Sequence, residues 1–293
     1  MKLSPDTAVG EFIPLSTHVS PTVIKSVGGD FLMVWRLEGL PFVGREEWEI
    51  QHRHNSFNRL LQTLRAPDYT NVAFWVHDVR RRRRLDDASR FKQAFNQSLS
   101  DAYFHSLSTQ KLMQNELYLT MLYRPIVAGR RFAEKSADIE RLASAQQQAI
   151  DKVLELASNV EAVLKEYAPT RLRMYEAANG VVFSEALEFY GHLLNRVDEP
   201  VPVLKAPIHR YLSVSRQRFS AKTGDYVITT PTGENHFGAL LNIKEYPEGT
   251  HPGILNGLKY LDFEYVITHS FSPMGRHDAL KALERTKGMM ISS

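Results

Sequence analysis

Five consecutive arginines are the residues of this chain best suited to bind a charged partner. The run consists of Arg80, Arg81, Arg82, Arg83 and Arg84. Its guanidinium groups could bind phosphate from lipid or nucleic acid, or an acidic segment of a protein partner. They could equally form a solvated loop that pairs with nearby acids such as Asp86 and Asp87. The run has no interleaved aromatic residues, which disfavours a stacking platform for single-stranded bases.

The position of the run leads to an expectation about stability. It follows the apolar segment 72–79, which predicts a strand, so we expect the run to emerge at the domain surface. Exposed ion pairs contribute under about 1 kcal/mol each. On this reasoning, replacing Arg81, Arg82 and Arg83 with serine leaves folding nearly intact.

Motifs of the common catalytic sites are absent from the sequence. There is no Gly-x-x-x-x-Gly-Lys-Ser/Thr loop to hold nucleotide phosphates, and Lys222-Thr223 lacks the preceding glycines. There is no Gly-x-Ser-x-Gly elbow, and with no Cys there is no thiol nucleophile. We therefore predict no catalytic, cofactor-binding or metal-binding residue here, and no ATP binding by this chain alone.

The histidines do not form a metal-binding pattern. His52 and His54 lie two residues apart on a predicted helix, so their side chains point in different directions. His77 and His269 fall on predicted strands, where a hydrogen-bonded structural role is the simpler expectation.

A long helix is predicted from about residue 133 to 167, with apolar residues spaced alternately by four and three. The candidate seam residues are Ile139, Ile150, Val153, Val160 and Leu164. The pattern extends over roughly four heptads, or about 45 Å. A helix that crosses its own sheet and a helix that contacts a neighbouring subunit both show this spacing. We expect a buried seam in either case.

Hydrophobic patterning predicts the α+β fold class, with mixed β-sheets and flanking helices. Residues 1–132 contain predicted strands at 22–27, 31–37, 72–79 and 117–123. Two helices are predicted among them, at 46–64 and from about Asp86-Asp87, where acidic residues favour a helix start, the second with an apolar stripe. That stripe consists of Phe91, Phe95, Leu99 and Ala102.

The chain divides into two sheet-containing subregions, 1–132 and 169–293, joined by the helix at 133–168. In the second subregion a helix at 184–194 begins after Ser184, a favourable N-cap residue. Gly29-Asp30-Phe31 and Gly224-Asp225-Tyr226 open strands in similar ways, which would fit a duplicated ββαβ unit.

Composition indicates an ordinary globular protein. Of the 293 residues, 43% are hydrophobic and 24% charged, and the net charge of +3 is too small to indicate nucleic acid by itself. No apolar run approaches the about 18 residues of a membrane-spanning helix, and the first ten residues lack a secretory signal. The absence of Cys fits a cytoplasmic location.

Four segments, in order, resemble the amino-terminal part of the CagE/TrbE/VirB ATPases of bacterial type IV secretion and conjugation systems. They are Phe12-Ile-Pro-Leu-Ser-Thr-His-Val19, Asn71-Val-Ala-Phe-Trp-Val-His-Asp-Val-Arg-Arg-Arg82, Asn115-Glu-Leu-Tyr-Leu-Thr-Met-Leu-Tyr-Arg-Pro125 and Glu264-Tyr-Val-Ile-Thr-His-Ser-Phe-Ser272. Phe31-Leu-Met-Val-Trp-Arg-Leu-Glu-Gly39 adds to the likeness. None of these segments is a catalytic signature.

The resemblance implies a role and a set of partners. In that family a motor domain with ATP and Mg²⁺ follows this region, and we expect the motor to be absent from this chain. The implied function is assembly and docking, which holds the ATPase at the cytoplasmic face of the bacterial inner membrane. The implied system powers pilus biogenesis and the translocation of DNA or protein.

Implied partners are a small inner-membrane subunit, the tails of an inner-membrane scaffold protein, other secretion ATPases and further copies, as a dimer or hexamer. The alternative is a nucleic-acid-binding module that feeds DNA to the motor through Arg80–Arg84.

Overall fold

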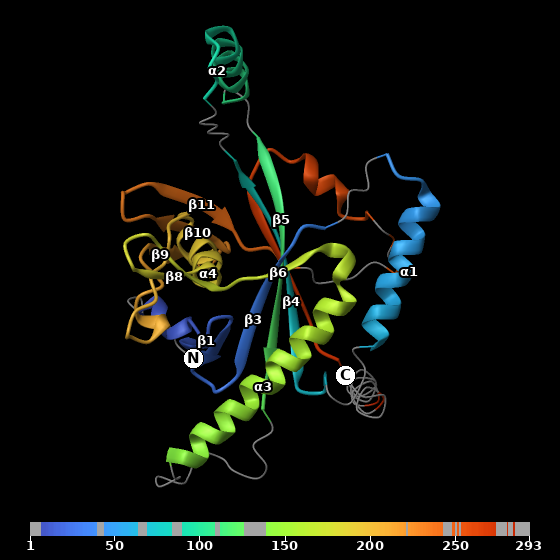
Figure 1. The fold of residues 1–293 in the computed structure, drawn as a ribbon, viewed down its shortest axis with the longest axis vertical. Helices are drawn as coiled ribbons and strands as arrows, with labels where there is room; N and C mark the ends of the chain where they lie inside the picture. Colours follow the sequence, from blue (N-terminus) through green and yellow to red (C-terminus); the bar gives the residue numbers. More distant parts are fainter. Residues whose placement is uncertain are drawn as a thin grey trace.

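A long antiparallel sheet forms the centre of the computed structural model (Figure 1). The structure describes residues 7–39, 44–63, 69–83, 90–108, 112–125, 139–220, 222–242, 248–249, 251, 253–273, 280 and 284. Within this part, the central sheet has seven strands in the order β1-β2-β3-β5-β4-β12, and β6 also pairs with β3. They are β1 (Leu15–Ser20), β2 (Val23–Ser26), β3 (Phe31–Leu37), β4 (Val72–Arg82), β5 (Met113–Tyr123), β6 (Pro169–Arg171) and β12 (Tyr265–Phe271). The α+β class is confirmed, and every described strand pairing is antiparallel.

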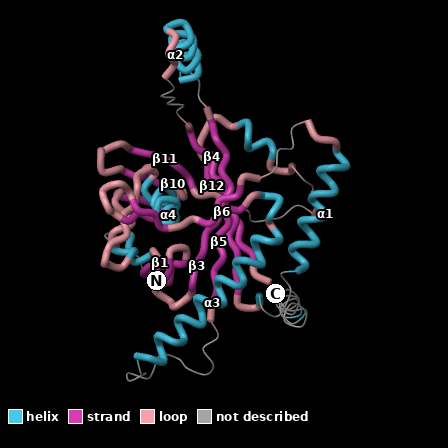
Figure 2. The backbone as a smooth tube through the Cα atoms, viewed as in Figure 1, coloured by secondary structure: helices cyan, strands magenta, loops and turns pink. Residues whose placement is uncertain are grey.

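Two helices cover opposite faces of this sheet, and two more lie towards its margins (Figures 1 and 2). Helix α3 (Ile139–Val163) crosses one face and α4 (Glu185–Asn195) packs on the other. Helix α1 (Glu47–Thr63) lies beside α3, whereas α2 (Ala94–Ser108) stands apart at the end of β4 and β5. Short 3₁₀ turns occupy Val9–Phe12, Lys165–Tyr167, Ile208–Arg210 and Asn256–Tyr260. No helix in the described ranges is long and apolar enough to span a bilayer.

The face under α3 holds the first hydrophobic core. Trp35, Phe74 and Met121 come from three neighbouring strands and are almost fully buried. The helix contributes the seam, where four of the five candidate residues are buried, namely Ile150, Val153, Val160 and Leu164. The side chain of Ile139 lies outside the described residues. The seam therefore contacts the chain's own sheet.

A polar contact fixes the direction of α3 across that face. Trp35 Nε1 donates to Glu161 Oε1 at 2.7 Å, and Arg171 on β6 pairs with the same carboxylate. Burial opposes ionisation of Glu161, but the hydrogen bonds from Arg171 and Trp35 outweigh it and lower its pKa. Helix α3 and strands β3 and β6 are thus joined through the carboxylate of Glu161.

The face under α4 holds the second core. Leu187 and Phe189 of α4 pack on Tyr118 of β5, with the Phe189 and Tyr118 rings stacked at 4.2 Å between centroids. The predicted N-cap is confirmed, because the Leu187 N–H donates to Ser184 Oγ at 3.3 Å. Because α3 covers one face of the sheet and α4 covers the other, β4 can carry apolar side chains on both of its faces.

Two smaller sheets flank α4. One pairs β7 (Met174–Glu176) with β8 (Val182–Ser184). The other has the order β11-β10-β9, formed by β9 (Arg216–Phe219), β10 (Asp225–Thr229) and β11 (Asn235–Ala239).

The central sheet is shared between the two sequence-predicted subregions. Strands β6 and β12 come from 169–293, yet β6 pairs with β3, and β12 pairs with β4 along its whole length, from Tyr265↔Arg80 to Phe271↔Phe74. The division into 1–132, 133–168 and 169–293, and the duplicated unit, remain predictions. The described topology places the last strand of one part beside a strand of the other.

Candidate functional site

The arginine run lies inside strand β4. The strand continues through Arg82, and its ladder with β5 runs from Val72↔Tyr123 to Arg82↔Met113. The expectation that the run would follow the strand is therefore wrong for Arg80, Arg81 and Arg82. The expected surface position is wrong for Arg80, which is buried, and for Arg81, which is half-buried, whereas Arg82 is exposed. The reason is that β5 and later segments supply hydrogen-bond acceptors along the ladder, which allow charged residues to extend the strand. Arg83 is exposed and its N–H donates to Leu112 O at 2.9 Å, while Arg84 lies outside the described residues.

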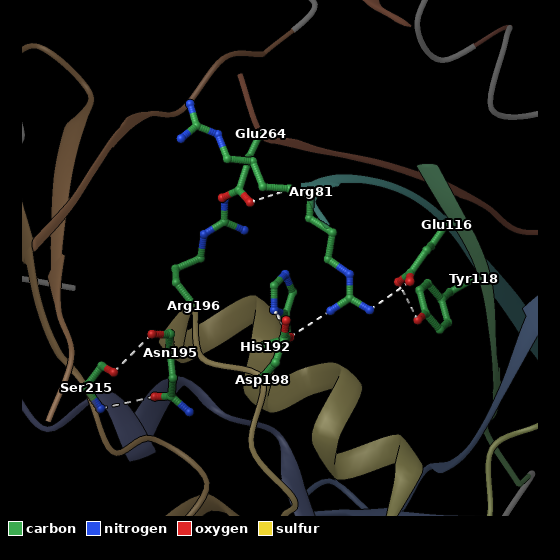
Figure 3. Close-up of polar contacts among 10 residues, drawn as sticks. Arg81, Glu116, Tyr118, His192, Asn195, Arg196, Asp198, Ser215 and Glu264 are labelled. Carbon is green, nitrogen blue, oxygen red and sulfur yellow. Dashed lines mark hydrogen bonds and ion pairs between the residues drawn. The ribbon is translucent and has the colours of Figure 1, made fainter. Parts of the chain in front are cut away.

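Arg81 is the centre of a network that joins the sheet to α4 (Figure 3). Its Nη2 donates to Glu116 Oε1 and its Nη1 to Asp198 Oδ1, each at 2.7 Å. The side chains of Arg81 and Glu116 are 16% and 8% exposed, whereas that of Asp198 is 60% exposed. One half of the network is therefore buried and the other half is open to solvent.

Two further side chains complete this network. Tyr118 Oη donates to Glu116 Oε2 at 2.9 Å, and His192 Nδ1 of α4 lies 2.7 Å from Asp198 Oδ1. The hydrogen bond from His192 lowers the pKa of Asp198; burial opposes this, and the charges of His192 and Arg81 lower the pKa further. Burial and the neighbouring Glu116 raise the pKa of Tyr118, which keeps its hydroxyl a donor. Each charge thus has a partner of opposite sign or a hydrogen-bond donor.

Arg80 points to the other face of the sheet, and its guanidinium group also donates hydrogen bonds within the chain. The residue is 8% exposed, its Nε donates to Leu261 O at 3.2 Å, and its Nη1 donates to Asn115 Oδ1 at 3.0 Å. The backbone N–H of Arg82 donates to Glu264 Oε1 at 2.8 Å, and Arg196 lies 3.6 Å from the other oxygen of Glu264. These contacts tie β4 to the segment that precedes β12 and to the end of α4.

The end of α4 is held by Asn195, which the sequence analysis did not single out. Its Oδ1 accepts from the N–H groups of Val214 and Ser215, and its Nδ2 donates to Leu212 O at 2.8 Å. Figure 3 shows the contact with Ser215. Arg196 follows in the left-handed region at φ 58°. A sequence cue exists in the Asn at the end of an apolar helical pattern, since such residues favour helix termini.

His77 on β4 has structural partners, whereas His269 on β12 is exposed. His77 Nδ1 lies 3.0 Å from Thr268 Oγ1, and its Nε2 lies 3.3 Å from Thr120 Oγ1, which in turn contacts Tyr190 Oη. Burial lowers the pKa of His77 to about 4, so the ring is neutral at pH 7. Within the described residues, no group of three His, Cys, Asp or Glu side chains could hold a metal ion.

A cavity of about 410 Å³ lies where α1 approaches β3, β4 and β5. The residues that line it include three basic ones (Arg45, Arg53, Lys259) and four acidic ones (Glu38, Glu49, Asp78, Glu116), of which Glu116 has its carboxylate bound to Arg81. The mixture gives no excess of positive charge for nucleotide phosphates. We therefore infer that the described polar groups hold neighbouring strands and helices together. We assign them no catalytic role.

Comparison with protein families gives two consecutive matches. Residues 22–130 match the family described as type IV secretion system ATPase VirB4/TrbE, N-terminal domain. Residues 170–293 match the CagE, TrbE, VirB family, described as a component of type IV transporter systems. These matches cover both sequence subregions and end on either side of α3.

Individual relatives align with almost the whole chain. The type IV secretion system protein virB4 of Brucella suis is 35% identical over 296 residues, covering 98% of this chain and 35% of that protein. The type IV secretion system protein PtlC of Bordetella pertussis is 32% identical over 295 residues, with the same coverage. The virB4 protein of Bartonella henselae is 27% identical over 290 residues, covering 97% of this chain and 36% of that protein. The chain thus spans about a third of the length of the curated relatives it matches.

Proposed function

Because the chain belongs to the CagE/TrbE/VirB family of type IV transporter components, we propose that it is the amino-terminal assembly and docking region of a secretion ATPase. The observation that carries the proposal is the pair of family matches at 22–130 and 170–293, in a sequence that has no phosphate-binding loop. In this proposal the region holds the motor at the cytoplasmic face of the inner membrane. The whole protein powers pilus biogenesis and the translocation of DNA or protein.

The exposed surface supports a docking role. The three-stranded sheet and the residues after it expose large apolar side chains, with Phe237 80% and Leu241 95% exposed. Phe219 and Leu240 are exposed beside them. Apolar surface of this kind is typical of protein-interaction sites. The double-sided core and the Arg81 network support it by holding the elements beneath in fixed positions.

The partners we propose are the small inner-membrane subunit, the cytoplasmic tails of the inner-membrane scaffold, other secretion ATPases and further copies of this protein. ATP and Mg²⁺ belong to the motor in this proposal and have no assigned residue in the chain described here.

The alternative role in nucleic-acid binding is less well supported by the geometry. Arg80 and Arg81 already donate to acceptors within the chain, so at most part of the run is available for phosphate. Phosphate neutralisation by several cations gives a steep salt dependence. Binding to DNA with such a dependence, in the absence of binding to secretion subunits, would favour this alternative.

Co-purification tests the proposal. The tagged chain is co-expressed with its cognate inner-membrane subunits, extracted in mild detergent and recovered at low and high salt. We expect the small subunit or the scaffold to be retained, and we expect the double variant Phe237→Ser/Leu241→Ser to retain several-fold less. Leu204→Ser/Tyr260→Ser, which removes two large exposed side chains from outside this surface, is the control. Failure to retain any cognate subunit with the wild-type chain would contradict the docking role.

A further inference from the structure

Helix α2 carries an apolar stripe that the described residues leave uncovered. Phe95, Leu99 and Tyr103 lie four residues apart and are 73%, 60% and 58% exposed. Phe91, just before the helix, is 47% exposed. In Figures 1 and 2 the helix stands apart from the sheet, beyond the ends of β4 and β5. These side chains would be costly to leave in water, since each exposes a large apolar area.

The rest of the helix is nearly uncharged and mixes polar residues with Phe104 and Leu107. Between residues 94 and 108 the only formal charge is Asp101, and the other polar residues are Asn, Gln, Ser, Tyr and His. Of these, Gln97 Nε2 donates to Asp101 Oδ1 at 2.8 Å, so the carboxylate is held along the helix. The helix therefore offers an exposed apolar stripe and little charge, with Phe104 on the side opposite Phe95.

Positive charge gathers beside the helix. Arg90 and Lys92 immediately precede it and are exposed, and Arg82 and Arg83 are exposed at the end of β4. An aromatic stripe next to basic residues is complementary to the acyl boundary and the headgroups of an anionic membrane leaflet. The 15 residues of α2 extend about 22 Å, which is too short to cross a hydrocarbon core of about 30 Å. Such a helix can lie in the interface.

The spacing of the stripe disfavours a coiled-coil partner. A seam between helices needs alternate spacings of three and four, as in α3, to stay aligned with its partner. The large exposed side chains Phe95, Leu99 and Tyr103 are spaced by four, which rotates each about 40° further around the helix, so they spread over about 80°. An apolar face of this width fits the apolar layer of a lipid surface better than the narrow seam of a coiled coil. The flanking cations would also repel those of a second copy placed side by side.

We propose that α2 is an interfacial membrane-binding helix that inserts Phe95, Leu99 and Tyr103 into an anionic lipid surface, with Arg90 and Lys92 at the headgroups. The inference deepens the proposed function, because it names one contact through which the docking region would reach the membrane. It requires no secretion subunit, so it can be tested with lipid alone.

Vesicle sedimentation tests the proposal on the full chain. The probes are vesicles of phosphatidylcholine mixed with phosphatidylglycerol, and vesicles of phosphatidylcholine only. We expect the wild type to sediment with the anionic vesicles and the Phe95→Ser/Leu99→Ser variant to bind at least about tenfold more weakly. The charge variant Arg90→Glu/Lys92→Glu should also bind more weakly, and high salt should reduce wild-type binding.

Controls separate a lipid contact from other causes. Leu204→Ser/Tyr260→Ser removes large exposed side chains, 49% and 87% exposed, from outside α2 and the proposed docking surface, and should sediment as the wild type does. Circular dichroism melting checks that all variants fold. Absence of wild-type binding to anionic vesicles, or equal losses in the α2 and control variants, would overturn the proposal. So would a fall in oligomeric mass for the α2 variant with unchanged vesicle binding, which would assign the stripe to a second copy.

The outcomes for the lipid contact and for docking are distinguishable. Loss of vesicle binding with normal retention of secretion subunits in detergent would leave the proposed function standing and confirm a separate role for α2. A chain that retains its subunits and never binds anionic vesicles would refute only the lipid inference.

Discussion

Replacement of Arg81 by methionine should destabilise the protein far more than the same change at Arg83. Arg81→Met removes two hydrogen bonds of 2.7 Å and leaves the Glu116 carboxylate, 8% exposed, without its cation. Breaking a buried ion pair on one side costs about 3–5 kcal/mol. We take the lower end, about 3 kcal/mol, because Tyr118 still donates to Glu116 and because Asp198 is largely exposed and adds little. Arg83→Met, at an exposed position, should cost about 0.5 kcal/mol or less.

Urea unfolding followed by tryptophan fluorescence provides the assay, since Trp35 is fully buried in the central sheet. A second variant isolates the charge: adding Glu116→Gln to Arg81→Met removes the uncompensated carboxylate and should recover about 1–2 kcal/mol. The reasoning is refuted if Arg81→Met and Arg83→Met differ by less than about 1 kcal/mol. The outcome also tests the expectation, drawn from sequence, that serine at positions 81–83 leaves folding nearly intact; the ion pair of Arg81 with the buried Glu116 carboxylate argues against it.

Three further predictions concern the core, acid stability and nucleotide. Ile150→Asp should cost about 3–5 kcal/mol because it places a charge in the core under α3, whereas Gln148→Asp on the exposed side should cost little; thermal melts that coincide would show that the seam faces water. His77 has a folded pKa of about 4 against 6.5 unfolded, so the unfolded state gains the proton first and stability should fall by up to roughly 3 kcal/mol as the pH drops from 6.5 to 4. His77→Gln should flatten that part of a pH series of unfolding free energies, and an unchanged slope would contradict the assignment. Isothermal titration of the chain with Mg-ATP should show no binding, and micromolar affinity would contradict the sequence argument.

The elements with strong local patterns were predictable from sequence. Apolar residues of α3 recur with helical spacing over several turns, and this pattern indicates both the helix and the side of it that is buried. Ser184 before the apolar run indicates the start of α4, since a hydroxyl at that position can accept a backbone N–H. Helices and helix caps depend on residues a few positions apart, so the local sequence pattern indicates them directly.

The polar network was not predictable because its partners are distant in sequence. Glu116 lies 35 residues from Arg81 and Asp198 lies 117 residues away, so the sequence shows only adjacent like charges. The same holds for β12, whose alternating residues indicate a strand but carry no information that its neighbour is β4. The stripe of α2 gives a third example, because amphipathic spacing indicates an apolar face without indicating whether the protein covers it.

The central claim, that this region docks a secretion ATPase onto inner-membrane components, is tested most directly by comparing two ligands across a salt series. Fluorescence anisotropy would measure binding of the chain to a labelled cytoplasmic tail of the cognate scaffold protein and to a labelled DNA duplex. The account predicts saturable binding to the tail that persists at physiological salt, and weaker DNA binding that falls steeply as salt rises. Tight DNA binding together with no measurable affinity for the tail would contradict it.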